Sequence, residues 1–223
     1  MINIFVGFDQ RESVAYHTFC QSIIEKATVP VCFTPLALNS LQGYVETHND
    51  GSNQFIYSRF LVPYLMGYQG WAIFADGDMI CRDDIAKLWM MRDDSKAVMV
   101  VKHDYKTKAH DKYLGNRNED YPRKNWSSVI LWNCAHGFNR DIDLNYVMTH
   151  PGSHLHRFSW LPDEAIGEIP AVWNWLTTEY PDNYEAKLLH YTLGTPCFKD
   201  YQNSEMSELW HQAHDRVNQG MGG

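Results

Sequence analysis

The first 38 residues contain the pattern that most restricts the fold of this chain. Residues 2–6 are a short apolar run, typical of a buried strand, and residues 11–27 carry apolar side chains near helical spacing. Residues 29–38 are again rich in β-forming side chains, but Pro30 and Pro35 predict an edge strand or one with irregular ends. A strand, a helix and a strand in this order predict a parallel sheet in an α/β protein.

The same two patterns recur along the rest of the chain. Continuous apolar runs predict strands over 71–75, 97–101, 127–132 and 186–191, and helical spacing predicts helices over 55–68 (with Pro63 as a kink), 83–91 (capped by Asp83) and from Ser204 onward. The polar stretches 39–54 and 103–124 are predicted loops. Because a loop as long as 103–124 is usually functional, we expect it to help cover a site. The glycine-rich end, 220–223, is expected to fray.

Composition limits the partners of this protein. The 223 residues suit one large domain or at most two small ones, and 44% hydrophobic with 21% charged residues is ordinary for a globular chain. The net charge of −8 argues against nucleic acid, which needs a basic face, but a small phosphorylated ligand can still bind beside a metal ion. Aromatic residues, at 14%, can fill a core or cover the apolar face of a sugar.

The cysteines and the N-terminus indicate a compartment. Five cysteines, none in a C-x-x-C pair, predict neither a disulfide framework nor a structural zinc site, and a reducing compartment fits them best. The first residues lack the basic region and long apolar core of a signal peptide. No apolar run approaches the roughly 20 residues that span a membrane. We therefore expect a cytoplasmic protein without a transmembrane segment.

The strongest local signal is Asp76-Gly77-Asp78, directly after the apolar run 71–75. In open α/β sheets, ligands bind where strands end, and two aspartates beside a glycine can converge on one hard cation while phosphates approach the backbone. The same letters between two apolar runs also form a strong hairpin-turn signal. The local sequence leaves a metal site and a hairpin turn as alternatives.

Short segments spread over nearly the whole chain resemble one family. They are Phe8-Asp9 at the end of the first strand, then 57–65, 71–78, 84–89, 127–133, 172–174 and 189–191. In this order they are similar to the signature of glycosyltransferase family 8. That is the retaining, GT-A-fold family that contains glycogenin and bacterial lipopolysaccharide galactosyl- and glucosyltransferases. The differences described below predict a divergent relative.

The resemblance implies one domain over 1–223, of GT-A type, with a Rossmann-like, mostly parallel central sheet. In such a domain residues 1–100 mainly bind the nucleotide, 101–200 mainly form the acceptor half, and 201–223 are a C-terminal tail.

The resemblance also implies a metal site formed by Asp76, Asp78 and His190. Two carboxylates with one imidazole suit Mn²⁺ somewhat better than Mg²⁺. His190 follows Asp78 by 112 residues, so only the fold can bring them together. The alternative for His190 is a core histidine whose hydrogen bonds are satisfied on a strand.

Other residues are implied in donor binding. The family contacts uridine at the position of Phe8 and Asp9, and its diphosphate or sugar near Arg59. The alternatives are a helix cap for Asp9 and a buried ion pair for Arg59. Asp76 and Gly77 are also implied in donor binding, because the glycine lets the phosphates of the donor approach the backbone closely. The last element of the family is His-x-x-Gly-x-x-Lys. Here Gly194 follows His190 one residue later than in the family, and Lys199 stands three residues later than the family's lysine.

Asp163 and Glu164 stand where the family has Asp-Gln-Asp. This alignment predicts that Asp163 contacts a sugar hydroxyl and that Glu164, in place of the glutamine, stabilises charge at the anomeric carbon. The alternative is a helix start with acidic residues in its first turn. Similarly, Trp126-Ser127-Ser128 replaces the family's Asn-Ser-Gly.

The expected function is metal-dependent transfer of a hexose from a UDP-sugar, with retention, to a saccharide or glycolipid acceptor that can lie at a membrane surface. A sugar-phosphate nucleotidyltransferase also combines an α/β sheet with metal-bound carboxylates, but residues 7–11 are a poor match to its glycine-rich phosphate loop. A non-catalytic carbohydrate-binding protein explains the aromatic residues and leaves the aspartate pair unexplained. An aspartate phosphatase is a weaker alternative, because its Asp-x-Asp follows the first strand.

Overall fold

The computed structural model describes residues 1–49, 51–108, 111, 115 and 119–219, so the predicted fraying of 220–223 lies outside the described residues. A six-stranded sheet forms the centre, with the order β2-β1-β3-β6-β5-β7. Its strands are β1 (Ile2–Gly7), β2 (Val31–Leu36), β3 (Trp71–Ala75), β5 (Val98–Val100), β6 (Val129–Asn133) and β7 (Ile166–Glu168). The apolar runs at 2–6, 71–75, 97–101 and 127–132 therefore form strands as predicted.

Five of the six strands run in the same direction. β1 is parallel to β2 and β3, β7 is parallel to β5, and β6 alone is antiparallel to its neighbours β3 and β5. The prediction of an α/β fold with a mostly parallel central sheet is thus confirmed. β2 lies at the edge of the sheet, where Pro35, which lacks a backbone N–H, is compatible with strand pairing on one side only.

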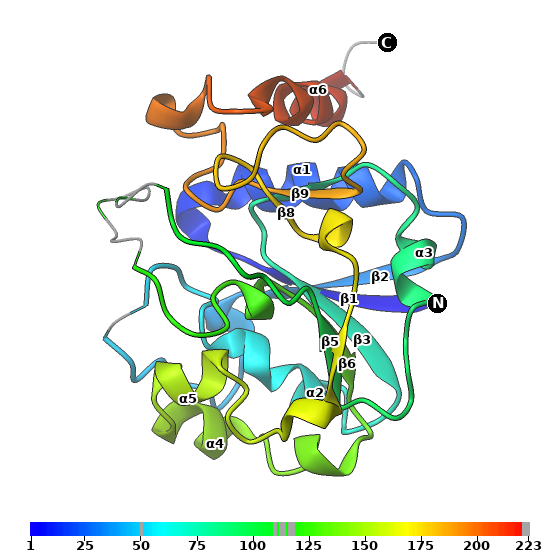
Figure 1. Ribbon diagram of the computed structural model, residues 1–223, viewed down its shortest axis with the longest axis vertical. Coiled ribbons are helices and arrows are strands. Elements are labelled where there is room, and N and C mark those ends of the chain that lie inside the picture. Colours follow the sequence, from blue (N-terminus) through cyan, green and yellow to red (C-terminus); the bar gives the residue numbers. More distant parts are fainter. Residues whose placement is uncertain (50, 109–110, 112–114, 116–118, 220–223) are drawn as a thin grey trace.

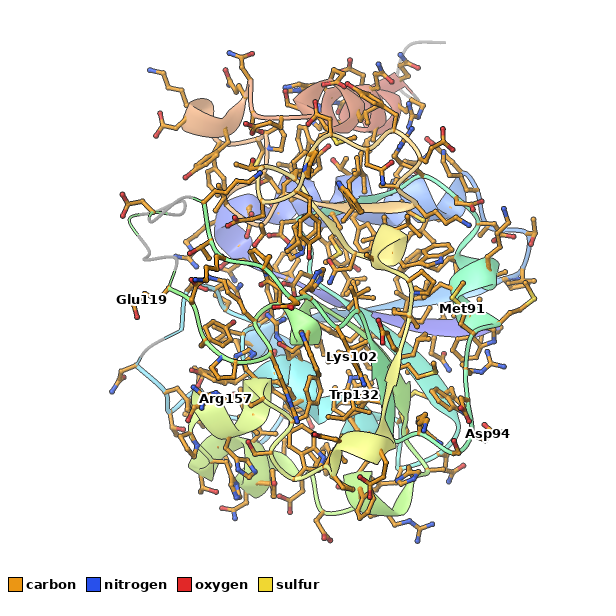
Figure 2. The ribbon with its side chains drawn as sticks, viewed as in Figure 1. Met91, Asp94, Lys102, Glu119, Trp132 and Arg157 are labelled. Atoms are coloured by element: carbon orange, nitrogen blue, oxygen red, sulfur yellow. The ribbon has the colours of Figure 1, made fainter. Side chains whose placement is uncertain are left out.

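Side chains alternate between the two faces of the sheet and fill a core on each. Phe5, Phe74 and Trp132 belong to one core cluster, and Ile4 and Ile73 belong to the other. Such alternation is the period of two that a strand imposes. Trp132 is fully buried and lies deep in the molecule (Figure 2).

Helices cover both faces (Figure 1). The helices are α1 (Ser13–Ile24), α2 (Val62–Leu65), α3 (Ile85–Trp89), α4 (Leu144–Thr149), α5 (Gly152–His156) and α6 (Ser207–Asn218). In the view of Figure 1, α1 lies above the central sheet and α2, α4 and α5 lie below it. None of the helices among the described residues is long and apolar enough to cross a membrane.

A second, smaller sheet lies on the α1 side. Its order is β4-β9-β8, formed by β4 (Met79–Cys81), β8 (Trp175–Leu176) and β9 (Leu188–His190). α6, the predicted helix of the tail, covers this sheet in the upper part of Figure 1, where Trp210 packs in one cluster with Leu189 and Tyr191. The run predicted at 186–191 therefore forms a strand of this second sheet.

Two predicted helices differ from the observed ones. Only Val62–Leu65 of the segment 55–68 is α-helical, after a 3-10 turn at Ser58–Leu61. Pro63 stands in the first turn of α2, where a missing N–H has no helical acceptor to lose, so it begins the helix instead of kinking it. In α3 the N-cap is Asp84, whose side chain accepts a hydrogen bond from the Ala86 N–H, so the prediction of Asp83 is wrong by one residue.

Candidate metal and nucleotide-sugar site

The segment Asp76-Gly77-Asp78 joins two strands that belong to different sheets. β3 pairs with β1 and β6, whereas β4 pairs with β9. The hairpin-turn alternative is therefore wrong, because a hairpin requires β3 and β4 to pair with each other. A Cβ atom on Gly77 would lie 2.4 Å from the carbonyl oxygen of Gly7, so only glycine lets this segment pack on the end of β1.

Asp76, Asp78 and His190 converge at this point. Each offers a ligand atom within 4.8 Å of the others, and the side chains are buried. His190 Nε2 lies 3.3 Å from Asp78 Oδ1 and 3.8 Å from Asp76 Oδ2. Two ligands at right angles on an octahedral ion, each about 2.1 Å from it, lie about 3 Å apart. The three side chains therefore fit one divalent cation.

The β4–β9 ladder explains how residues so distant in sequence meet. Met79 is paired with His190, and the Tyr191 N–H donates to the Asp78 carbonyl at 3.0 Å. Since neighbouring strands lie about 4.8 Å apart, this register places the imidazole beside the carboxylates. The ladder pairs two segments that are far apart in the sequence, and no periodicity in the sequence indicates this pairing.

Asn174 fixes the orientation of the His190 ring. Its Oδ1 lies 3.1 Å from His190 Nδ1, and its Nδ2 donates to Ser128 Oγ at 2.7 Å. An amide oxygen only accepts, so Nδ1 carries a proton; in the neutral imidazole this leaves on Nε2, which faces the aspartates, a lone pair that can bind a cation. Such support of a metal-binding histidine is typical of protein metal sites.

Arg59 is buried beside the same carboxylates. Its Nη1 lies 2.7 Å from Asp76 Oδ1 and donates to the Ser127 carbonyl at 2.9 Å, while Nε donates to the Ile56 carbonyl. The guanidinium also lies over the Phe74 ring, with its central carbon 5.0 Å from the ring centre. Arg59 thus forms the buried ion pair that the sequence left as an alternative, and it also lines a pocket.

This pocket lies where β3 ends and β6 begins. The described residues that line it are Ser52, Asn53, Ile56, Arg59, Asp76, Asp78, Tyr121, Asn125, Ser127, Ser128, His156, His190 and Thr192. The lining is polar, with one guanidinium and two carboxylates among neutral hydrogen-bonding groups. Tyr121 comes from the segment predicted to cover a site, of which residues 109–110, 112–114 and 116–118 lie outside the described residues.

Five predicted donor-binding residues do not line this pocket, namely Phe8, Asp9, Gly77, Gly194 and Lys199. Asp9 caps the 3-10 turn Gln10–Glu12, so the cap alternative is observed. Burial raises the pKa of the Asp9 carboxyl, but hydrogen bonds from Arg11 and from the Gln54 N–H outweigh this effect, and the pKa is lowered. Phe8 packs edge-on against Tyr16.

Gly194 and Lys199 lie after β9. A Cβ on Gly194 would lie 2.7 Å from the Tyr201 ring, so this glycine is needed for packing, and Lys199 is exposed. Donor contacts from Phe8, Asp9, Gly77, Gly194 and Lys199 stay predictions.

Asp163 and Glu164 lie away from the pocket. Both precede β7, whose first residue, Ile166, is level with Val98 at the beginning of β5. The pair therefore lies at the edge where the parallel strands begin, whereas Asp76 follows the end of β3. Both side chains are exposed; Asp163 pairs with Arg123, and neither lines the pocket. A sugar contact from Asp163 and a charge-stabilising role for Glu164 stay predictions that this position does not support.

Several site residues were absent from the predicted set, namely Asn125, His156, Asn174, Tyr121 and Thr192. Asn174 belongs to the segment 172–174, which resembles the family, and this resemblance was the available indication of a functional role. His156 lies in a segment with histidines at 150, 154 and 156, and this density was the available signal. The others belong to irregular segments, where sequence patterns carry little information.

Near this site, His103 makes the fold sensitive to acid. Its Nδ1 shares a 2.8 Å hydrogen bond with the Tyr180 hydroxyl, and burial, aided by His190, lowers its pKa to about 3. Between that value and about 6.5 the unfolded chain binds a proton that the folded chain does not. The contribution of His103 to the free energy of unfolding is therefore fully present above pH 6.5 and decreases as the pH falls toward 3.

We expect His103→Gln to reduce this acid sensitivity. At pH 5.5, one unit below the unfolded pKa, one such histidine costs about 1.4 kcal/mol. Urea unfolding in EDTA at pH 7.5 and 5.5 measures the loss, which is expected to be smaller by about that amount in the variant. His17→Gln, at an exposed position of α1, is the control. An equal loss in wild type and His103→Gln contradicts the prediction.

The sequence profile of glycosyl transferase family 8 matches residues 10–139, more than half of the chain. Protein CDI of Arabidopsis thaliana is 41% identical over 224 residues, which cover 96% of this chain and 86% of that protein.

Solved structures resemble the fold. The apo form of the bifunctional glycosyltransferase WbbM has a TM-score of 0.69 at 12% identity, with 98% of this chain and 51% of that one covered, so this chain spans about half of WbbM. The galactosyltransferase LgtC, in complex with donor and acceptor sugar analogues, has a TM-score of 0.59 at 13% identity, with 96% of both chains covered. At these identities the likeness shows the fold alone.

The family match decides among the function classes that the sequence left open. A nucleotidyltransferase, a phosphatase or a non-catalytic sugar-binding protein does not account for a match that includes the turn Asp76-Gly77-Asp78 and the arginine before it. The chain belongs to glycosyl transferase family 8 and is a glycosyltransferase with the GT-A fold.

Proposed function

We propose that this enzyme transfers a hexose from a UDP-sugar to a saccharide or glycolipid acceptor, with a divalent cation, Mn²⁺ or Mg²⁺, held by Asp76, Asp78 and His190. The observation that carries the proposal is the convergence of two carboxylates and one oriented imidazole within 4.8 Å in a polar pocket. Bound there, the cation neutralises the charge that grows on the departing UDP.

The charge of the pocket supports a metal-dependent diphosphate site. Among the described lining residues, the charged groups are Asp76, Asp78 and Arg59, which sum to −2 + 1 = −1. A diphosphate would be repelled by this charge. With a divalent cation the sum becomes −1 + 2 = +1, so the metal makes the pocket attractive to the donor.

The protein groups have separable parts in this proposal. Arg59 holds Asp76 at its Oδ1 and adds a fixed positive charge beside the diphosphate. Asn174 holds the His190 ring at Nδ1, so that Nε2 faces the two aspartates. No carboxylate other than Asp76 and Asp78 lines the pocket among the described residues, so a covalent sugar intermediate on a third carboxylate is not part of the proposal. Retention is proposed from the resemblance to the retaining family.

Three further features are proposed with it. Residues 1–223 form one domain, in which 1–100 mainly bind nucleotide, 101–200 mainly form the acceptor half and 201–223 are a tail. The acceptor lies free or at a membrane surface. A cytoplasmic location is proposed because all five cysteines are free thiols.

Thermal unfolding tests the donor and the metal together. UDP or a UDP-hexose with Mn²⁺, at about 100 times the dissociation constant, stabilises the folded state by about 2.7 kcal/mol. For a domain of this size the melting temperature is expected to rise by roughly 5–10 °C.

EDTA is expected to abolish the rise, and ADP and GDP with Mn²⁺ serve as nucleotide controls. A parallel assay follows release of UDP from each bound UDP-hexose, and release of pyrophosphate from UTP supplied with the corresponding hexose 1-phosphate. UDP release supports the proposal, whereas an equal thermal shift without metal, or release of pyrophosphate, contradicts it.

A further inference from the structure

His156, the last residue of α5, connects a helix below the sheet to the pocket. Its Nδ1 shares a 2.8 Å hydrogen bond with the hydroxyl of Ser127. The ring packs against Phe60 and Tyr57, with ring centres 5.2 and 5.6 Å away. One nitrogen and the ring faces are therefore held by the protein, and the residue lines the pocket beside Arg59.

The ring is held in its neutral form. Burial, followed by the positive charge of Arg59 and by His48, keeps the pKa of His156 well below its usual value. A neutral imidazole adds no charge to the pocket. It offers a single hydrogen-bonding nitrogen whose donor or acceptor role depends on the tautomer.

That nitrogen, Nε2, is buried and has no hydrogen-bond partner among the residues that the structure describes. Leaving a buried polar atom unpaired is unfavourable, so such atoms in native proteins call for an explanation, which a ligand can provide. Here the atom belongs to a residue of the pocket wall, and its ring cannot turn without losing the bond to Ser127.

We propose that His156 binds a hydroxyl group of the donor sugar through Nε2 and so contributes to the choice of donor. The inference rests on the proposed function. A hydroxyl both donates and accepts, so it pairs with either tautomer of the imidazole. The diphosphate, by contrast, carries negative charge and is served by Arg59 and the cation, so a neutral nitrogen suits the uncharged sugar.

The position of His156 also separates it from the metal site. It is bonded to Ser127, whose backbone carbonyl accepts from Arg59, whereas Asp76 is paired with Arg59 and His190 is bonded to Asn174. Removing Nε2 is thus expected to affect the sugar and to leave the UDP and metal contacts intact. A residue with a purely structural role would weaken both to the same extent.

Calorimetric titration of UDP and of the best-bound UDP-hexose, both with Mn²⁺, tests the inference in wild type and His156→Phe. Phenylalanine keeps an aromatic ring and removes both nitrogens. We expect the dissociation constant of UDP to stay within about twofold and that of the UDP-hexose to rise about 10-fold or more, as for a lost buried hydrogen bond. His154→Phe, on the same helix but outside the pocket lining, is the matched control.

A second variant, His156→Gln, separates recognition from folding. Its amide is neutral and keeps hydrogen-bonding capacity, so donor binding is expected to recover in part, with an altered ratio of kcat/KM between UDP-glucose and UDP-galactose. The inference is overturned when UDP and UDP-hexose weaken by the same factor in His156→Phe, or when neither weakens. Absence of UDP binding by the wild type instead overturns the proposed function, and the inference with it.

Discussion

Replacing Asp78 with asparagine is expected to abolish Mn²⁺-dependent binding of UDP while the protein remains folded. The substitution removes one of two negative charges and keeps the shape of the side chain. A hard cation depends on the charge of its ligands, and loss of one of three protein ligands is expected to weaken binding by roughly a hundredfold or more. The thermal shift with Mn²⁺ and UDP, compared with the shift in EDTA, is the measurement.

Two comparisons make the Asp78→Asn result specific. Asp182→Asn removes the same charge at an exposed position and is expected to retain the full metal-dependent shift. Titration of Mn²⁺ without nucleotide shows whether the metal itself is lost. A variant that binds Mn²⁺ and UDP as well as the wild type would show that the Asp-Asp-His cluster is not the metal site.

Gly77→Ala is expected to damage both stability and the site. The backbone of Gly77 does not need a positive φ, so the requirement is for space alone. The new Cβ would meet the carbonyl oxygen of Gly7 at 2.4 Å, and β1, which is paired on both sides, cannot move away. The free energy of unfolding is expected to fall by about 1–3 kcal/mol, with a melting temperature lower by roughly 2–12 °C.

The same variant is expected to lose most of the Mn²⁺- and UDP-dependent shift, because the displaced turn carries Asp76 and Asp78. Gly137→Ala is the control, since nothing lies within 4 Å of the Cβ that it adds. If Gly77→Ala keeps the stability and the metal response of the wild type, the close packing of the turn on β1 does not position the carboxylates.

Long apolar runs made much of the fold predictable. The segments 71–75 and 97–101 are buried on both faces of the sheet, so each reads as an unbroken hydrophobic run. Likewise, the β-α-β opening predicted the parallel pairing of β1 with β2. The candidate metal ligands Asp76 and Asp78 followed from their position after such a run, whereas His190 came from family resemblance.

Short elements and irregular segments were not predictable. β4 and β8 are three and two residues long, too short to show a period, so the second sheet was missed. The reversed direction of β6 depends on pairing with β3 and β5, which no local pattern encodes. His156 reaches the pocket only because the short helix α5 packs under the sheet.

The pairing of β4 with β9 has a consequence for how an ion enters the site. Asp78 and His190 enclose a loop of 112 residues, whose closure has an entropic cost of about 4 kcal/mol. Backbone hydrogen bonds of the ladder already hold the ends together. An incoming ion therefore finds preorganised ligands, and little of its binding free energy is diverted into ordering the chain. We therefore expect the affinity for the proposed cation to be set by the donor atoms themselves, and the cation to exchange without unfolding of the chain.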